Sequence, residues 1–274
     1  MGRSSMPATG WAWTGTSSNR ISARLRIPAP AVFLVGAAAA SDLVPALSGV
    51  GLDVVEEVVT VALIMILFDG GMGIGLRRFR AAVTPILVVG VLGTLLTAAA
   101  MALLAHVLLG LAWPLALLLG TALAPTDPAV VFSVLGNREV SGRAGVIIEG
   151  ESGANDPVGI ALLVSLVAAG GDLNAAAAGS IAGTFALQMV VGAAVGVGGG
   201  WLMLQAIRKL PLPTEALYPL RTLAISLAVY GVATVAHGSG FLAVFVAGIM
   251  LGDAGAPFKR EIERFHSSLA GLAE

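Results

Sequence analysis

Apolar residues run in long stretches along this chain, separated by short polar segments. Most of the stretches reach or exceed the roughly 20 residues that an α-helix needs to cross a bilayer core of about 30 Å. The first and the last stretch are shorter. Eight stretches can be distinguished, at roughly 27–40, 54–73, 81–109, 113–135, 145–169, 180–206, 217–236 and 240–251. The pattern predicts an all-α, polytopic membrane protein with about eight transmembrane helices.

Composition supports a chain embedded in the lipid bilayer. Hydrophobic residues make up 57% of the 274 residues and charged residues only 11%, against about 25% charged residues in soluble domains. Zero cysteines exclude disulfides and thiolate metal sites, and no basic run suggests nucleic acid or a cofactor. The glycines at 192–200 predict a face of close helix packing. Residues 1–18 are polar and are expected to be disordered or an aberrant start, whereas 19–274 form the transmembrane domain.

The basic residues predict an orientation in the membrane. Apart from Arg3, all of the 15 Lys and Arg residues fall on alternate loops. The positive-inside rule places these loops, and the N-terminus, in the cytoplasm of a multi-pass cell-membrane protein. The polar tail at 258–274 is amphipathic, and it is either a surface helix or the start of a further span.

Three acids interrupt the apolar segments at similar depth. Counted from the predicted span ends at about 1.5 Å per residue, Asp69, Asp127 and Asp156 lie roughly 20–22 Å along their helices. A charge at this depth costs several kcal/mol unless it is paired, hydrated or protonated. For Asp69 the alternative is that the predicted span ends earlier than assumed, so that the acid lies at its end, because Gly70 and Gly71 follow it.

Two prolines predict a broken helix around Asp127. Pro125 and Pro128 lack the N–H that a helix needs, and they flank Thr126 and Asp127. Unwound backbone inside a membrane exposes carbonyl groups, such as that of Thr126, and transporters build cation sites from such groups. A simple proline kink is the alternative.

The segment around Asp156 offers matching oxygen ligands. Ser152 and Asp156 are four residues apart and share a helix face, and Asn155 adds a neutral amide. The carboxylate of Glu151 is expected either to pair with a basic residue or to face a water-filled funnel. Hard cations prefer oxygen ligands, and a proton can compete with a cation for a carboxylate in a dry site. Such competition indicates exchange of a monovalent cation against a proton.

At these residues the sequence resembles the NhaP type of monovalent cation/proton antiporters, within the sodium/proton exchanger superfamily. The matching motifs lie at 67–71, 126–128, 151–156 and 240–248. The resemblance implies a non-enzymatic transporter with an inverted-repeat antiporter fold, assembled as a homodimer. It also implies a site that consists of the carrier Asp156 with the ligands or neighbours Asp127, Thr126, Ser152, Asn155 and Asp69, supported by Glu151, Pro125 and Pro128.

The resemblance further implies an electroneutral exchange of Na⁺ or K⁺, since the Asn155-Asp156 pair carries one acid where the electrogenic branch has two. The family's members have a further span where 1–18 stands and several more spans after Glu274. The chain is therefore expected to be incomplete, with a basic partner for Glu151 in the absent half. Alternatives are an inactive membrane fragment, a half-transporter that needs a partner chain, and, less favoured, an intramembrane aspartyl enzyme.

Overall fold

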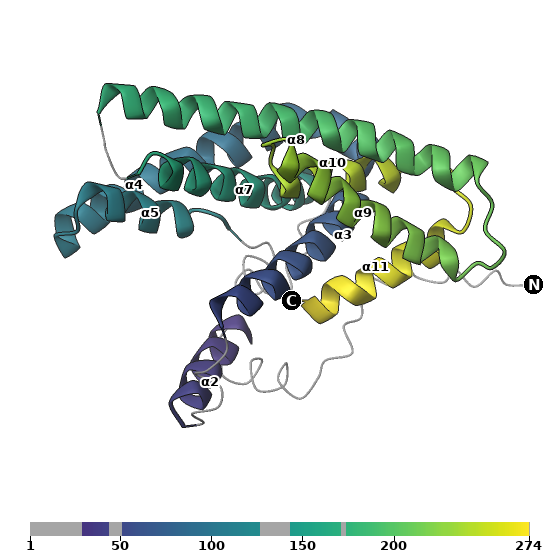
Figure 1. Cartoon of the computed structure of the whole chain (residues 1–274), viewed down its shortest axis with the longest axis horizontal. Coiled ribbons are helices and arrows are strands. Elements are labelled where there is room, and N and C mark those ends of the chain that lie inside the picture. Colours follow the sequence, from purple (N-terminus) through teal and green to yellow (C-terminus); the bar gives the residue numbers. More distant parts are fainter. Residues whose placement is uncertain (1–28, 44–50, 127–142, 171–173, 274) are drawn as a thin grey trace, which may run out of the picture. The chain divides into compact units, whose positions relative to one another are not determined.

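The computed structural model describes residues 29–43, 51–126, 143–170 and 174–273. Within these residues the secondary structure is helical and contains no strand, as Figure 1 shows. The predicted all-α class is therefore confirmed. The helices are α2 (Ala29–Leu43), α3 (Leu52–Leu87), the π-helix η1 (Val88–Gly93), α4 (Thr94–Leu109), α5 (Trp113–Ala122), α7 (Arg143–Ala168), α8 (Ala175–Lys209), α9 (Leu217–Val235), α10 (Gly240–Gly252) and α11 (Lys259–Ala273).

Each of the eight predicted apolar segments overlaps a helix in the described residues. Three helical stretches there are long and apolar enough to cross a membrane, at Leu52–Leu109, Ala176–Lys209 and Leu217–Val235. The first has 58 residues, which would reach about 87 Å as a straight helix and far exceeds a bilayer core. This stretch therefore contains more than one crossing. Residues 1–18 lie outside the described residues.

A break at Gly75 divides that stretch. Gly75 has φ 70° and ψ 160°, a conformation that favours glycine. Just after it, the backbone N–H of Arg77 donates a hydrogen bond to the carboxylate of Asp253, which follows α10. The carboxylate thus satisfies a free N–H at the start of the second half of α3. The break falls between the segments predicted at 54–73 and 81–109.

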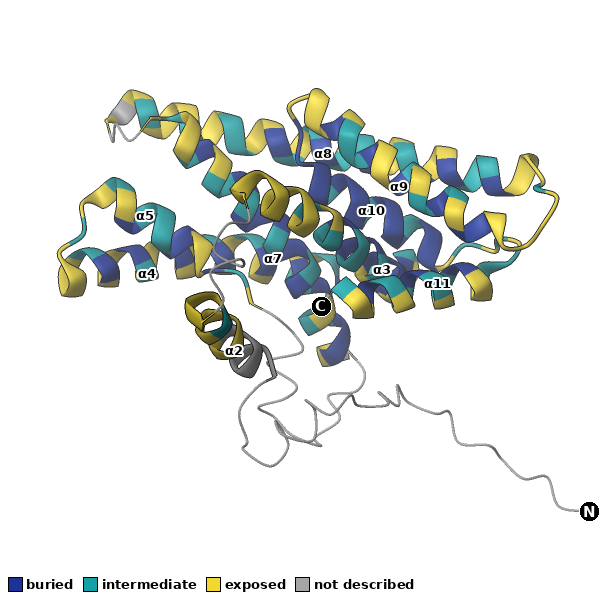
Figure 2. Ribbon diagram, turned by 60° about the horizontal axis from the view of Figure 1, so that its bottom comes forward, coloured by how far each residue is buried: buried dark blue, intermediate teal, exposed yellow. Residues whose placement is uncertain are grey.

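The chain divides into two compact units, residues 1–55 with 129–137 and residues 56–128 with 138–274. In the first unit the described residues form α2 and the start of α3. In the second unit α10 is central: ten of its 13 residues are buried, and it packs against α7, α8 and α9. Figure 2 shows the dark blue of buried residues along this helix.

Glycines allow the helices of the second unit to approach closely. A Cβ atom on Gly71 of α3 would lie 2.4 Å from the backbone oxygen of Phe245 on α10. On the opposite side of α10, a Cβ atom on Gly196 of α8 would lie 2.6 Å from the backbone oxygen of Ala243. The packing face predicted for the glycines at 192–200 is therefore present, and backbones touch where side chains would not fit.

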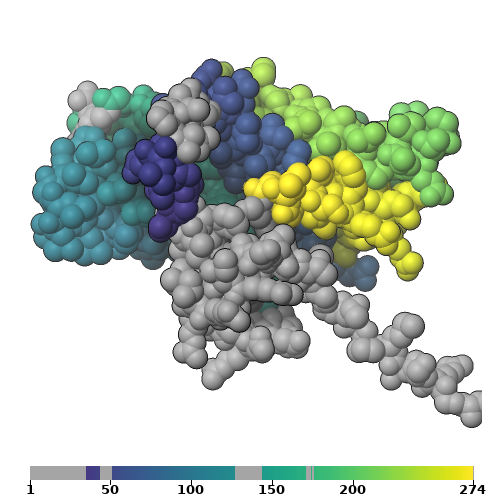
Figure 3. All heavy atoms as spheres, turned by 90° about the horizontal axis from the view of Figure 1, so that it is seen from below, coloured from purple at the N-terminus to yellow at the C-terminus, as the bar shows by residue number. Residues whose placement is uncertain are grey.

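The amphipathic tail forms the separate helix α11. Its apolar side buries Ile262, His266 and Ala270, and Figure 3 shows the helix, in yellow, at the surface of the molecule. Lys259, in its first turn, pairs with Glu263 at 3.2 Å and donates to the backbone oxygen of Gly252 at the end of α10. The positive charge meets the negative end of the α10 dipole, which favours this arrangement.

Candidate ion-binding site

The helix α5 ends just before the proline pair. Its last residue is Ala122 and the chain is non-helical at Ala124, Pro125 and Thr126. Pro125 disfavours the α conformation at the residue before it, which agrees with the non-helical Ala124. The predicted break is thus present on this side and begins slightly earlier than expected, while Asp127 and Pro128 lie outside the described residues.

Three side chains of α7 converge on Thr126. Ser152 donates from Oγ to the backbone oxygen of Thr126 at 3.0 Å. Asn155 donates from Nδ2 to Oγ1 of Thr126 at 2.9 Å and to its backbone oxygen at 3.3 Å. The hydroxyl of Thr126 in turn donates to the Glu151 carboxylate at 3.2 Å. Four of the predicted site residues are therefore in contact with one another.

Asn155 is the most enclosed member of this cluster. Its exposed fraction is 0%, and that of Ser152 is 5%. Nδ2 of Asn155 also donates to the Glu151 carboxylate at 2.9 Å, whereas its side-chain oxygen Oδ1 has no hydrogen-bond partner among the described residues. The backbone oxygen of Thr126 and the Glu151 carboxylate can only accept hydrogen bonds. The amide of Asn155 therefore turns its nitrogen, and not its oxygen, toward them.

Small residues hold α7 close to its neighbours around the cluster. A Cβ atom on Gly159 would lie 2.7 Å from Cγ of Pro125. A Cβ atom on Gly90, in the π-helix η1, would lie 3.0 Å from Cβ of Ala154 and 3.4 Å from the backbone oxygen of Glu151. Nothing in the sequence around Gly90 predicts this contact. A π-helical turn often occurs beside a functional site, but it has no simple sequence signature.

The acids of α7 have different surroundings. Asp156 is half-buried and follows Asn155 directly. Glu149 pairs with Arg78 of α3 at 3.3 Å in a half-exposed salt bridge, a contact that the sequence analysis did not predict. Glu151, for which a basic partner was expected, receives its hydrogen bonds from the neutral groups of Thr126 and Asn155.

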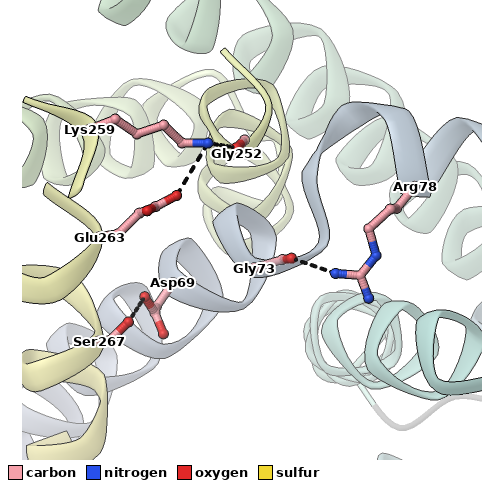
Figure 4. Close-up of polar contacts among 7 residues, drawn as sticks. All are labelled: Asp69, Gly73, Arg78, Gly252, Lys259, Glu263 and Ser267. Atoms are coloured by element: carbon pink, nitrogen blue, oxygen red, sulfur yellow. Dashed lines mark hydrogen bonds and ion pairs between the residues drawn. The ribbon is translucent and has the colours of Figure 1, made fainter. Parts of the chain in front are cut away.

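Asp69 makes its hydrogen bond at a different place. Ser267 of α11 donates from Oγ to Oδ1 of Asp69 at 2.9 Å, and Figure 4 shows the two side chains pointing toward one another from α3 and α11. The structure thus connects Asp69 to α11 and not to the hydrogen-bonded cluster around Thr126. A role of Asp69 as a ligand stays a prediction.

Curated relatives of this chain are bacterial antiporters. A protein of Alkalimonas amylolytica named K(+)/H(+) antiporter NhaP is 38% identical over 259 residues, which are 93% of this chain and 44% of the relative. A K(+)/H(+) antiporter NhaP2 of Shewanella sp. strain MR-4 is 34% identical over 85% of this chain and 41% of the relative. An Na(+)/H(+) antiporter NhaS2 of Synechocystis sp. is 29% identical over 84% and 41%. The chain therefore spans about two-fifths of the length of these relatives.

A solved structure supports the fold. The sodium proton antiporter MjNhaP1 from Methanocaldococcus jannaschii superposes with a TM-score of 0.75 at 20% identity, covering 93% of this chain and 64% of the other. The family model described as "Sodium/hydrogen exchanger, transmembrane" matches residues 13–274. This chain belongs to the sodium/hydrogen exchanger family of membrane transporters.

Proposed function

We propose that this chain carries the ion site of an antiporter that exchanges Na⁺ or K⁺ for a proton across the cell membrane. The observation that carries the proposal is the convergence of Glu151, Ser152 and Asn155 of α7 on Thr126, where α5 has ended. In this proposal the carboxylate of Asp156, next to Asn155 on the same helix, binds the transported cation or the proton. Asp127 follows Thr126 directly and completes the site, with Asp69 as a more distant neighbour.

Competition at one carboxylate explains the exchange. A carboxylate surrounded by protein in the membrane is neutralised either by a proton or by a cation, so binding of one releases the other. Ser152 and the Thr126 backbone supply neutral oxygens of the kind that replace water around a hard cation. Since Asn155 is neutral, one acid at the carrier position exchanges one cation for one proton. This supports an electroneutral transporter.

The proposal extends to the assembly and its orientation. The Lys- and Arg-bearing loops and the N-terminus face the cytoplasm by the positive-inside rule, and the chain works as a homodimer, as the resemblance implies. Names of the relatives include both K⁺/H⁺ and Na⁺/H⁺ antiporters, which supports a monovalent cation. Membership of a transporter family sets the intramembrane aspartyl enzyme aside.

Everted membrane vesicles that contain this chain provide the test. Addition of KCl or NaCl to vesicles acidified inside should release protons, which a pH-sensitive fluorescent dye detects. Asp156→Asn removes the exchanged charge and should abolish the response. Glu215→Gln, which removes an exposed carboxylate between α8 and α9, should leave it intact.

The two negative outcomes have different meanings. Equal exchange by Asp156→Asn and by the unaltered chain would contradict the assignment of Asp156. Absence of exchange by the unaltered chain, at normal amounts in the membrane, would contradict autonomous antiport. It would favour a half-transporter that needs a partner chain.

A further inference from the structure

Two buried side-chain oxygens, one on α5 and one on α7, have no hydrogen-bond partner among the described residues. The exposed fraction of Thr121, in the last turn of α5, is 1% and that of Asn155 on α7 is 0%. Oγ1 of Thr121 and Oδ1 of Asn155 make no hydrogen bond among the described residues. Buried polar atoms are nearly always paired, so an unpaired one indicates a water molecule or an ion at that place.

Both residues lie where α7 meets the end of α5. A Cβ atom on Gly159 would lie 2.7 Å from Cγ of Pro125 and 3.9 Å from the backbone oxygen of Thr121. Asn155 precedes Gly159 by one helical turn and binds Thr126, which follows Pro125. The contact therefore continues from the Thr126 cluster toward the start of α5, and Thr121 lies on it one turn further along.

Other buried hydroxyl groups of this chain show that the state of Thr121 is not a general property of its helices. Thr94 donates to the backbone oxygen of Gly90 four residues earlier, at 2.6 Å. Ser165 does the same toward Ala161 at 2.7 Å. Such bonds are the usual way in which a helical hydroxyl is satisfied. Thr121 makes no such bond among the described residues, which leaves its hydroxyl oxygen as a candidate ligand.

The chemistry of the two atoms restricts that ligand. Oδ1 of Asn155 can only accept a hydrogen bond or bind a cation, and the hydroxyl oxygen of Thr121 can do the same. The carboxylate of Asp156, adjacent to Asn155, brings negative charge to this part of α7. Neutral oxygens beside a carboxylate are ligands that hard cations prefer.

We propose that Thr121 is a further ligand of the ion site, and that its hydroxyl and the side-chain oxygen of Asn155 bind the transported monovalent cation on the side of Thr126 nearer the start of α5. This inference rests on the proposed function. It adds a residue outside the recognisable motif around Asp127, and it gives the Asn155 oxygen a role separate from that of its amide nitrogen.

The test measures cation binding through thermal stability. The purified chain is heated in detergent while KCl or NaCl replaces choline chloride at constant ionic strength, because a ligand that binds the folded state raises its melting temperature. Thr121→Val removes the hydroxyl and keeps the shape, whereas Thr121→Ser keeps the hydroxyl. Thr94→Val is the matched control, since it removes a buried hydroxyl that its own helix already satisfies.

Thr121→Val should need about tenfold more cation for half of the stabilisation, which corresponds to the loss of one good ligand. Thr121→Ser and Thr94→Val should stay within about twofold of the unaltered chain. Without added cation, Thr121→Val should melt no lower than the unaltered chain, because the lost hydroxyl has no hydrogen-bond partner among the described residues.

Three results would overturn the inference. Equal cation dependence of Thr121→Val and the unaltered chain would mean that the position holds water only. A melting temperature of Thr121→Val below that of the unaltered chain without cation would mean that the hydroxyl has a partner within the protein. If neither cation stabilises the unaltered chain, the proposed function is contradicted together with this assignment. This result differs from the first two because it concerns the unaltered chain and not Thr121→Val.

Discussion

His266 of α11 is a buried histidine whose surroundings favour the neutral ring. Its exposed fraction is 1%, and its ring packs on Phe68 with 4.8 Å between the centroids. Nε2 lies 2.8 Å from Oγ1 of Thr222, whose single proton goes to the backbone oxygen of Pro219. His266 therefore donates from Nε2. A proton on the buried Nδ1 would have no acceptor among the described residues, which favours the neutral ring.

This burial makes stability depend on pH. It lowers the pKa of His266 from 6.5 to about 4. Between these values the unfolded chain binds a proton that the folded chain does not, so stability is complete above pH 6.5 and falls as the pH decreases toward 4. The loss should reach about 3 kcal/mol. It is measured as the fall in melting temperature between pH 7 and pH 4, relative to that of His266→Gln, which cannot titrate.

The comparison with His266→Gln removes the effect of the other ionisable groups. Glutamine can still donate to Thr222, so its melting temperature should change less over the same pH range. Parallel curves for the two proteins would show that His266 is protonated in the folded state, and would refute the buried neutral form.

Sequence reasoning could predict part of the candidate site because the signals there are local. The prolines at 125 and 128 predict the break, whereas the resemblance of the motifs at 126–128 and 151–156 assigns Ser152 and Asn155 to the same site. The hydrogen bond between Asp69 and Ser267 joins residues 198 positions apart. No periodicity within a single helix encodes such a contact. The burial of the Thr121 hydroxyl without a partner among the described residues likewise becomes visible only in the folded chain.

At the scale of helices, two adjacent glycines of α3 differ in what surrounds them. A Cβ atom on Gly71 would lie 2.4 Å from the backbone oxygen of Phe245, whereas nothing lies within 4 Å of one on Gly70. Gly71→Ala should force α3 away from α10 and cost about 1–3 kcal/mol. Gly70→Ala should be neutral or stabilise the chain by up to about 1 kcal/mol, because alanine favours a helix.

Melting temperatures of the two alanine variants in detergent test this difference. The pair is well matched, since both changes add one methyl group to neighbouring positions of the same helix. Equal melting temperatures would mean that α3 and α10 do not pack through this glycine face.

The arrangement of the helices in sequence was the most predictable property of the whole molecule. Lipid cannot satisfy backbone hydrogen bonds, so long apolar segments have to be helical, and their ends follow from the polar residues between them. The break at Gly75 falls where the basic residues of the predicted loop begin. The division of the chain into two units has no such signal, because it depends on which segments pack together.

The alternation of charge makes a prediction about the whole chain in its membrane. Ala112 precedes α5, in a segment without Lys or Arg, whereas Thr214 lies between α8 and α9 beside Lys209. Three predicted crossings separate these exposed residues, so they should face opposite sides, with Thr214 in the cytoplasm. The natural chain has no cysteine and is its own unlabelled control. In intact cells a membrane-impermeant maleimide should label Ala112→Cys, and it should label Thr214→Cys only in everted vesicles. Labelling of both from the same side would require an even number of crossings between them and would refute the eight-span topology.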